Sequence, residues 1–292
     1  MERLLEKFIL YLKFELRFSD NTIKSYSYDL DKYFSFIKNK NIDIIFIIDN
    51  DIADYIKFLT ENKNKASSIN RSISTIKKFH SYLEDNNIIS HNPTLLIEAQ
   101  KHRRVYPNTL TVDEIEKIIT HIKIDSLMGF RDLSMITIMY SCGIRVSELI
   151  NLEFSNLFLK NDYIKILGKG KKERLVPIGE RAKINLVNYM NYRKKNKITS
   201  DGYVYLSYRN KQLTRMAINN IIKKYCFESQ IEKKISAHTF RHSFATHMLE
   251  GGADLRIVQE ILGHENINTT EIYTHLDNIY LKEIHKQCHP RG

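Results

Sequence analysis

Residues 238–273 read HTFRHSFATHMLEGGADLRIVQEILGHENINTTEIY, and this stretch decides the fold of the second half of the chain. Ser236 is a suitable N-cap for a first helix, and Gly251-Gly252 ends it where a positive φ is wanted. Within it, Phe240, Phe244 and Met248 form an apolar stripe at i, i+4 spacing. The stretch therefore predicts a helix that packs one face against a core.

Polar residues gather at the ends of the helices in this stretch. His238 and Arg241 share a helical face at i, i+3, and we expect this pair to stay clear of the core. A second helix, Asp254 to Leu262, begins at an aspartate cap and stops at Gly263, so His264 lies just beyond it. Tyr273 follows nine residues later. This concentration of chemically active side chains indicates a functional site.

The first hundred residues contain helical patterns without obvious chemistry. Leucine and phenylalanine recur every four residues from Leu4 to Leu16, and Ser19-Asp20 marks the start of a second helix. Asp49 opens a third helix, and Ser67 or Ser68 opens a fourth, which ends before Pro93. We predict a four-helix domain over residues 1–99, a linker over 100–108 and a second domain over 109–292.

The second domain is expected to be mainly α-helical with a small antiparallel β-sheet. Thr111 and Glu114 form a capping box for a helix ending near His121. Further elements follow in this order: a helix from Arg131 to Tyr140 ended by Gly143, a helix starting at Arg145, strands Tyr163–Leu167 and Arg174–Ile178 joined by the loop GKGKKE, helices at about 180–195 and 214–228, and a short amphipathic tail over 278–287.

The charge of the chain favours a polyanionic partner. The formal net charge is +11 and the isoelectric point is about 9.3. Residues 1–104 contain 17 Lys and Arg against 14 Asp and Glu, and residues 105–292 contain 28 against 20. The basic excess lies mostly in the second domain. Charge alone does not establish that this partner is nucleic acid, since many basic proteins bind none.

The composition argues against a membrane protein and against a disulfide framework. The longest apolar run, around Ile42 to Ile48, contains Asp43 and is too short to cross a bilayer. The three cysteines, Cys142, Cys226 and Cys288, have no CxxC spacing, so we expect reduced thiols and no cysteine zinc site. These features predict a cytoplasmic protein.

Four segments resemble motifs of the tyrosine recombinase/integrase family. They are SCGIRVSELINL around Arg145, GKGKKERLVPIG around Lys169, SAHTFRHSFATHMLEGGADLRIVQEILGH and TTEIYTHL. The resemblance covers essentially the whole chain, and within the family it is greatest to the Xer recombinases, which resolve chromosome dimers in bacteria; XerC and XerD remain alternatives. Cys142 stands where threonine is common, and Arg17-Phe18 replaces the usual Gly-Leu.

The resemblance implies a catalytic set with a defined role for each member. The set is Arg145, Lys169, His238, Arg241, His264 and Tyr273. Tyr273 would be the nucleophile, forming a 3′-phosphotyrosyl bond with DNA, and Lys169 would protonate the leaving 5′-oxygen. The two arginines suit the nonbridging phosphate oxygens because guanidinium binds them in a bidentate manner. No cofactor, ATP or metal is implied.

The resemblance also implies a two-domain C-shaped clamp that closes around a double-stranded DNA core site. Two recombinases would bind each core site and form a homo- or hetero-tetramer at synapsis, with a DNA translocase as a possible activator. The tail over 278–287 would pack into a neighbouring subunit. The implied cellular role is the resolution of chromosome dimers at cell division.

Three alternative functions remain open. An integrase or invertase of a mobile element would use the same chemistry. A metallohydrolase is suggested by His238 and His242 at i, i+4, but Thr239 stands where a zinc protease has its glutamate. A non-catalytic DNA-binding protein would explain the charge but not Tyr273 or Lys169. We interpret His242 and His247 as structural residues.

Overall fold

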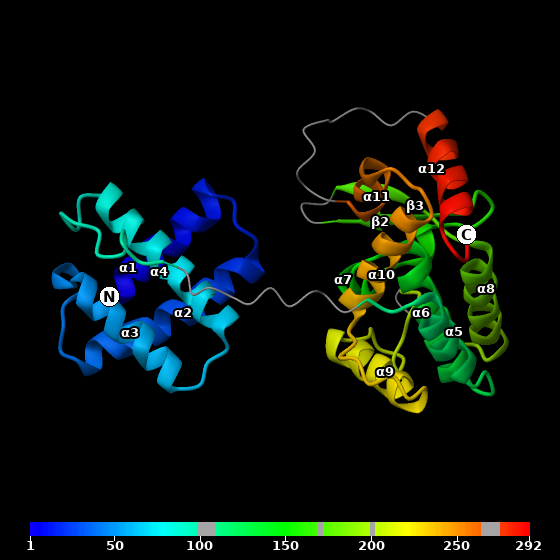
Figure 1. The fold of residues 1–292 in the computed structure, drawn as a ribbon, viewed down its shortest axis with the longest axis horizontal. Helices are drawn as coiled ribbons and strands as arrows, with labels where there is room; N and C mark the ends of the chain where they lie inside the picture. Colours follow the sequence, from blue (N-terminus) through cyan, green and yellow to red (C-terminus); the bar gives the residue numbers. More distant parts are fainter. Residues whose placement is uncertain (99–108, 169–171, 199–201, 264–274) are drawn as a thin grey trace. The chain divides into compact units, whose positions relative to one another are not determined.

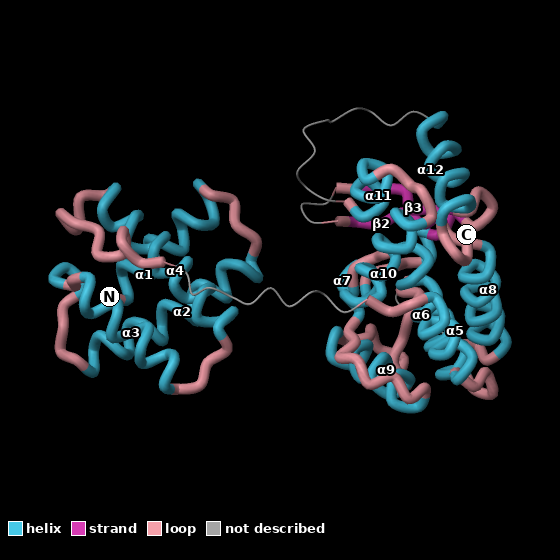
Figure 2. Tube along the Cα trace, viewed as in Figure 1, coloured by secondary structure: helices cyan, strands magenta, loops and turns pink. Residues whose placement is uncertain are grey.

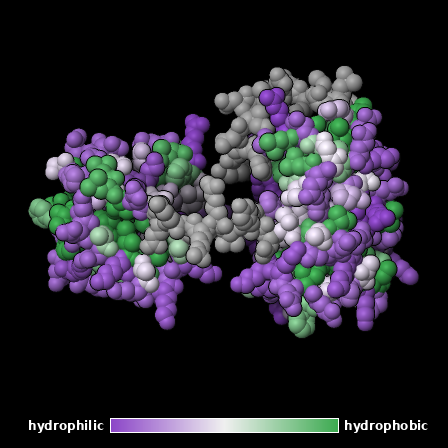
Figure 3. Space-filling model, in the orientation of Figure 1, coloured by the Kyte–Doolittle hydropathy of each residue, from purple (hydrophilic) through white to green (hydrophobic). Residues whose placement is uncertain are grey.

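The computed structural model describes residues 1–98, 109–168, 172–198, 202–263 and 275–292 (Figures 1 and 2). The chain separates into two compact units, Met1–Val105 and Tyr106–Gly292. The predicted linker over 100–108 lies outside the described residues. In Figure 3, hydrophilic side chains cover most of the visible face of each unit.

All the secondary-structure elements described in the N-terminal unit are helices or helical turns. Its elements are α1 (Glu2–Leu10), the π-helical turn η1 (Tyr11–Glu15), α2 (Asp20–Asn39), the 3-10 turn η2 (Ile44–Phe46), α3 (Asp49–Glu61) and α4 (Ala66–Asp85). The predicted cap of α2 is confirmed, since the Ser19 hydroxyl accepts a hydrogen bond from the Thr22 amide at 3.3 Å.

The start predicted for the fourth helix was wrong by one or two residues. The helix α4 begins at Ala66, and Lys65 is its N-cap without a side-chain hydrogen bond. The Lys65 carbonyl accepts hydrogen bonds from the amides of Ser68 and Ile69. The first turn therefore closes on a backbone carbonyl without a serine cap.

Two polar pairs, one buried and one at the edge of the apolar core, join helices of the N-terminal unit. The Tyr33 hydroxyl is 2.8 Å from Nε2 of His80, and both residues are buried. The Arg71 guanidinium donates two hydrogen bonds of 2.8 Å to the carboxylate of Asp29. Each pair joins α2 to α4, so both fix the packing of these two helices.

The C-terminal unit combines helices with a small sheet, as predicted. Its elements are α5 (Val112–His121), α6 (Leu127–Cys142), α7 (Val146–Ile150), the 3-10 turn η3 (Phe154–Asn156), β1 (Leu157–Phe158), β2 (Tyr163–Leu167), β3 (Glu173–Pro177), α8 (Glu180–Lys195), α9 (Arg215–Glu228), α10 (Ala237–Glu250), α11 (Leu255–Leu262) and α12 (His275–Cys288).

The sheet is antiparallel with the strand order β1-β2-β3. Tyr163 pairs with Pro177 and Leu167 pairs with Glu173, so the two predicted strands form one hairpin. The short strand β1 was not predicted, because two residues carry too little alternation to be recognised. The predicted class, mainly α with a small antiparallel sheet, is confirmed by this arrangement.

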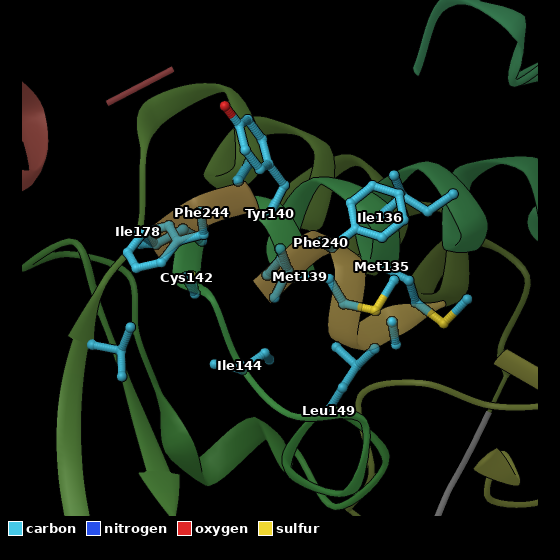
Figure 4. Packing of buried hydrophobic residues seen from close by; sticks show 14 of the residues in the cluster. Met135, Ile136, Met139, Tyr140, Cys142, Ile144, Leu149, Ile178, Phe240 and Phe244 are labelled. Atoms are coloured by element: carbon cyan, nitrogen blue, oxygen red, sulfur yellow. The ribbon is translucent and has the colours of Figure 1, made fainter. Parts of the chain in front are cut away.

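The helix α6 is the centre of the C-terminal unit. Its side chains Met135, Ile136 and Met139 pack with Phe240 and Phe244 of α10, and all five are buried (Figure 4). The aromatic and methionine stripe of α10 is therefore core, as its spacing predicts. The helix α6 begins four residues before the predicted start, because the Ser126 hydroxyl caps it by accepting from the Gly129 amide at 3.3 Å.

The last helix, α12, packs against its own unit. Leu281 and His285 are buried, and Nε2 of His285 lies 2.7 Å from the Ser141 carbonyl oxygen. Lys282 forms an ion pair with Asp162 in the turn before β2. The packing of this tail into a neighbouring subunit stays a prediction. None of the helices described is both long and apolar enough to cross a membrane.

Candidate active site

Arg145 occupies the N-cap of α7, immediately after the chain leaves the central helix. Gly143 ends α6 with φ of +57°, a left-handed conformation that glycine adopts without strain. The Arg145 amide then donates to Oε2 of Glu148 at 2.7 Å, and its Nη1 donates to Oε1 at 2.9 Å. Glu148 therefore holds both the backbone and the side chain of Arg145.

The C-terminal end of α11 is surrounded by three guanidinium groups. Arg174 donates from Nε to the Ile261 carbonyl at 2.9 Å, and Arg241 donates from Nη2 to the Leu262 carbonyl at 2.7 Å. The contacts of Arg145 are a 3.1 Å bond from Nη2 to the Gly263 carbonyl and a 3.4 Å bond from Nη1 to the Leu262 carbonyl. These carbonyls have no partner within the helix and lie at the negative end of its dipole, so they attract cations.

The prediction that Arg241 stays clear of the core was wrong. Arg241 is 8% exposed, and its Nη1 donates to the Gly143 carbonyl at 2.7 Å. His238, one turn earlier on α10, is exposed. The two side chains differ in burial because the carbonyls of Gly143 and Leu262 accept the hydrogen bonds of the guanidinium inside the protein, whereas the imidazole of His238 lies at the surface.

Burial and neighbouring charge act on the pKa values of this cluster in opposite directions. Burial, followed by the charge of Arg145, lowers the pKa of Arg241 to about 10, so it remains protonated at neutral pH. Burial alone would raise the pKa of Glu148, but hydrogen bonds and charge from Arg174, together with Arg145, lower it. Arg241 and Glu148 are therefore both ionised at neutral pH.

Glu148 and Arg174 are parts of this site that the residue patterns did not reveal. Arg174 donates from Nη1 and Nη2 to the two carboxylate oxygens of Glu148, both at 2.9 Å. The spacing of Arg145 and Glu148 is that of a capping box, a signal that was available in the sequence. Nothing local marks Arg174, whose partners lie 26 and 87 residues away.

Arg145 and His238 line the same surface hollow, which has a volume of about 210 Å³. Its other lining residues are Val146, Ser147, Arg215, Asn219, Ser236 and Ala237. The first turns of α7, α9 and α10 thus contribute residues to one hollow with two arginines. Arg241 is joined to the same site through the Leu262 carbonyl, which Arg145 also contacts.

The other three predicted site residues, Lys169, His264 and Tyr273, lie outside the described residues. The chain is described on both sides of each. Gly168 donates from its amide to the Lys172 carbonyl at 2.8 Å, and Gly263 ends α11 with φ of +67°. The structure thus brings together Arg145, His238 and Arg241.

Two further histidines of α10 differ in their surroundings. His242 is exposed, whereas His247 is buried and its Nδ1 lies 2.8 Å from the Tyr140 hydroxyl. That contact supports a structural role for His247. Among the residues that the structure describes, no three His, Cys, Asp or Glu are grouped so that they could hold a metal ion.

Comparisons with known proteins agree with this geometry. The Phage integrase family matches residues 108–278, and the Phage integrase, N-terminal SAM-like domain matches residues 5–87. The tyrosine recombinase XerD of Chlorobaculum tepidum is 41% identical over 99% of this chain and 96% of its own length. XerD of Listeria innocua is 38% identical over the full length of both.

Two solved recombinases are similar to the chain in fold. XerA recombinase is 30% identical, with a TM-score of 0.50 over 99% of this chain and 100% of its own. XerH bound to palindromic difH has a TM-score of 0.71 at 22% identity, over 96% of this chain and 82% of its own. Neither the metallohydrolase nor the non-catalytic alternative is favoured by these matches. Because the family match covers more than half of the chain and full-length relatives are 38–41% identical, the chain belongs to the Phage integrase family and is a tyrosine recombinase, an enzyme of site-specific DNA recombination.

Proposed function

We propose that the chain cuts and rejoins duplex DNA through a 3′-phosphotyrosyl intermediate on Tyr273 and resolves chromosome dimers at cell division. The similarity to XerD proteins along the whole chain supports this role over that of a mobile-element integrase. The single observation that carries the chemistry is the cluster of arginines around Glu148.

The charge of this cluster suits a phosphodiester under attack. Among the described residues, Arg145, Arg174 and Arg241 are balanced by the carboxylate of Glu148 alone, which leaves two positive charges in excess. A phosphodiester carries one negative charge, and attack by a phenolate raises it to two. Groups fixed before the reaction stabilise that added charge without having to reorganise.

The remaining steps are assigned to the other predicted residues. The Tyr273 oxygen attacks phosphorus, the bond to the 5′-oxygen breaks, and Lys169 supplies the proton that this oxygen takes up. His238 and His264 assist proton transfer and bind the phosphate oxygens. A 5′-hydroxyl from a partner strand then attacks the phosphotyrosine and releases Tyr273, so the number of bonds is conserved and no ATP is used.

We further propose that the two units, as two domains joined near residues 100–108, close as a clamp on a duplex core site. A λ integrase dimer and XerH have been solved on their own DNA sites, which supports this mode of binding. A related recombinase would occupy the second half-site, and the tetramer would act in the cytoplasm with a DNA translocase as activator.

The test is covalent trapping on a nicked suicide substrate in the presence of EDTA. The wild-type protein and the control variant Tyr208→Phe, whose side chain is 72% exposed, should form a protein–DNA adduct. Tyr273→Phe should bind the same DNA with unchanged affinity and form none. An adduct with Tyr273→Phe would refute the assignment of the nucleophile, and a requirement for a divalent metal would refute the metal-free mechanism.

A further inference from the structure

We propose that Arg174 is a positioning residue for the cleavage step, which acts by holding Glu148 so that Arg145 is presented to the scissile phosphate. The inference rests on the proposed function, because it assigns Arg145 to the phosphate. Arg174 belongs to β3 and is distant from Arg145 in the sequence. Its guanidinium contacts both Glu148 of α7 and the last turn of α11.

The contacts of Arg174 form a three-way junction. Nη1 and Nη2 bind the two oxygens of Glu148 at 2.9 Å each, and Nε binds the Ile261 carbonyl at 2.9 Å. Glu148 in turn accepts the amide and Nη1 of Arg145. One planar guanidinium thus fixes the sheet edge, the carboxylate and the end of α11, which lies beside β3 (Figure 1).

The position of Arg174 argues against direct contact with DNA. Its side chain is 15% exposed, compared with 35% for Arg145, and it does not line the hollow that Arg145 and His238 share. It also passes beneath Gly263, where a Cβ atom would lie 3.0 Å from its Cδ. Arg174 therefore acts through Glu148 and the α11 turn.

The loss of Arg174 changes what Arg145 can do. Glu148 is 4% exposed on its side chain, so its two oxygens cannot be satisfied by bulk water. With Arg174 removed, Arg145 is the remaining guanidinium on this carboxylate, and it is drawn further towards Glu148. The same donors are then less available to the phosphate, and a displacement of about 1 Å is enough to slow a reaction about 100-fold.

The experiment compares two substrates under single-turnover conditions at saturating protein. One has an ordinary scissile phosphodiester, which reaches two negative charges when attacked. The other has a methylphosphonate there, which is neutral and reaches only one. Stabilisation of the transition state by Arg145 therefore matters less for the methylphosphonate than for the phosphodiester. Arg174→Gln should cleave the phosphodiester about 100-fold more slowly than wild type, and the defect should fall below about 10-fold on the methylphosphonate.

Controls separate positioning from loss of charge or of folding. Arg181→Gln removes the same charge from an arginine that is 64% exposed on α8 and should cleave both substrates as wild type does. Binding of the phosphodiester DNA by Arg174→Gln should stay within about threefold of wild type. If Arg174→Gln does not fold, as judged by its thermal unfolding, Arg174→Lys takes its place. That variant keeps the charge without the bidentate fork, and its smaller defect should likewise shrink on the methylphosphonate.

Cleavage of both substrates by Arg145→Ala shows whether a negative result overturns the proposed function or only the inference about Arg174. If its defect does not shrink on the methylphosphonate, the assignment of Arg145 to the phosphate fails, and this inference fails with it. If the Arg145→Ala defect shrinks but that of the Arg174 variant is equal on the two substrates, Arg174 is a structural ion pair and the inference alone is overturned.

Discussion

Both units hold a carboxylate against a guanidinium, but they balance the charges differently. In the N-terminal unit, Asp29 faces Arg71 as one pair with two hydrogen bonds of 2.8 Å. In the C-terminal unit, Glu148 receives Arg145 and Arg174, and Arg241 lies beside them on the same helix end.

The Arg71–Asp29 pair has no net charge, whereas the cluster around Glu148 keeps an excess of positive charge among the described residues. The interaction of Arg71 with Asp29 contributes to the packing of α2 on α4. Three guanidiniums with a single carboxylate, among the described residues, cost solvation energy that the helix end offsets only in part. An excess of buried like charge of this kind is typical of a functional site.

The largest expected effect tests the unbalanced cluster. Arg145→Lys keeps the charge but loses the planar fork, so the cleavage rate should fall roughly 100- to 1,000-fold while DNA affinity changes little. Arg71→Lys is the matched control in the balanced pair and should leave the rate unchanged. Single-turnover cleavage at saturating protein measures both, and equal losses in the two variants would break the comparison.

The second effect concerns pH and the N-terminal unit. Burial lowers the pKa of His80 to about 4, below the value of 6.5 for an exposed histidine. Between these values the unfolded chain binds the proton and the folded chain does not, so stability falls as the pH is lowered from 6.5 to 4. The full loss is roughly 3 kcal/mol.

His80→Gln should remove most of this pH dependence, while His91→Gln, at an exposed histidine, should retain it. Hydrogen exchange of peptides from α2 and α4 in the full chain, at pH 7 and at pH 4, measures the difference. The same acid sensitivity in His80→Gln as in wild type would exclude His80 as its source.

A smaller effect is expected from the balanced pair itself. Asp29→Asn removes the charge but keeps the shape, and it should reduce the free energy of unfolding of this unit by about 2 kcal/mol. The loss stays modest because the Arg71 side chain is 46% exposed and remains solvated. Cleavage of bound DNA at saturating protein should be unchanged. Denaturant unfolding and adduct formation, measured on the same sample, test the two statements, and a selective loss of cleavage would assign this pair to function.

The smallest effect arises at the departure from the family pattern before α2. Arg17 has φ of +51°, a conformation that costs a non-glycine residue about 1 kcal/mol. Arg17→Gly should therefore stabilise the N-terminal unit by up to about 1 kcal/mol, less the extra entropy of glycine in the unfolded chain. Asn41→Gly, at φ of +55°, should gain less because asparagine tolerates this conformation. Thermal unfolding of the two variants measures which substitution stabilises the N-terminal unit more.

The helices and their ends were largely predictable from local signals. The Thr111 and Glu114 capping box, the Asp254 cap and the Gly263 stop all act within one turn of the chain, and the structure contains them as expected. At the end of α10 the positive φ belongs to Gly252, at +93°, while Gly251 has φ of −74°. The predicted pair therefore ends the helix, with the left-handed residue second.

The sequence by itself determined the helical class, the hairpin, the apolar stripe of α10 and the family to which the chain belongs, because each depends on residues close together in the chain or on extended motifs. The tertiary structure alone decided that Arg241 is buried, that Arg145 and His238 share one hollow, and that Arg174 reaches Glu148. Those outcomes depend on where carbonyl oxygens become available when α6, α7, α10 and α11 meet. Local spacing cannot contain that information, since a buried guanidinium is stable only where distant parts of the chain supply its acceptors.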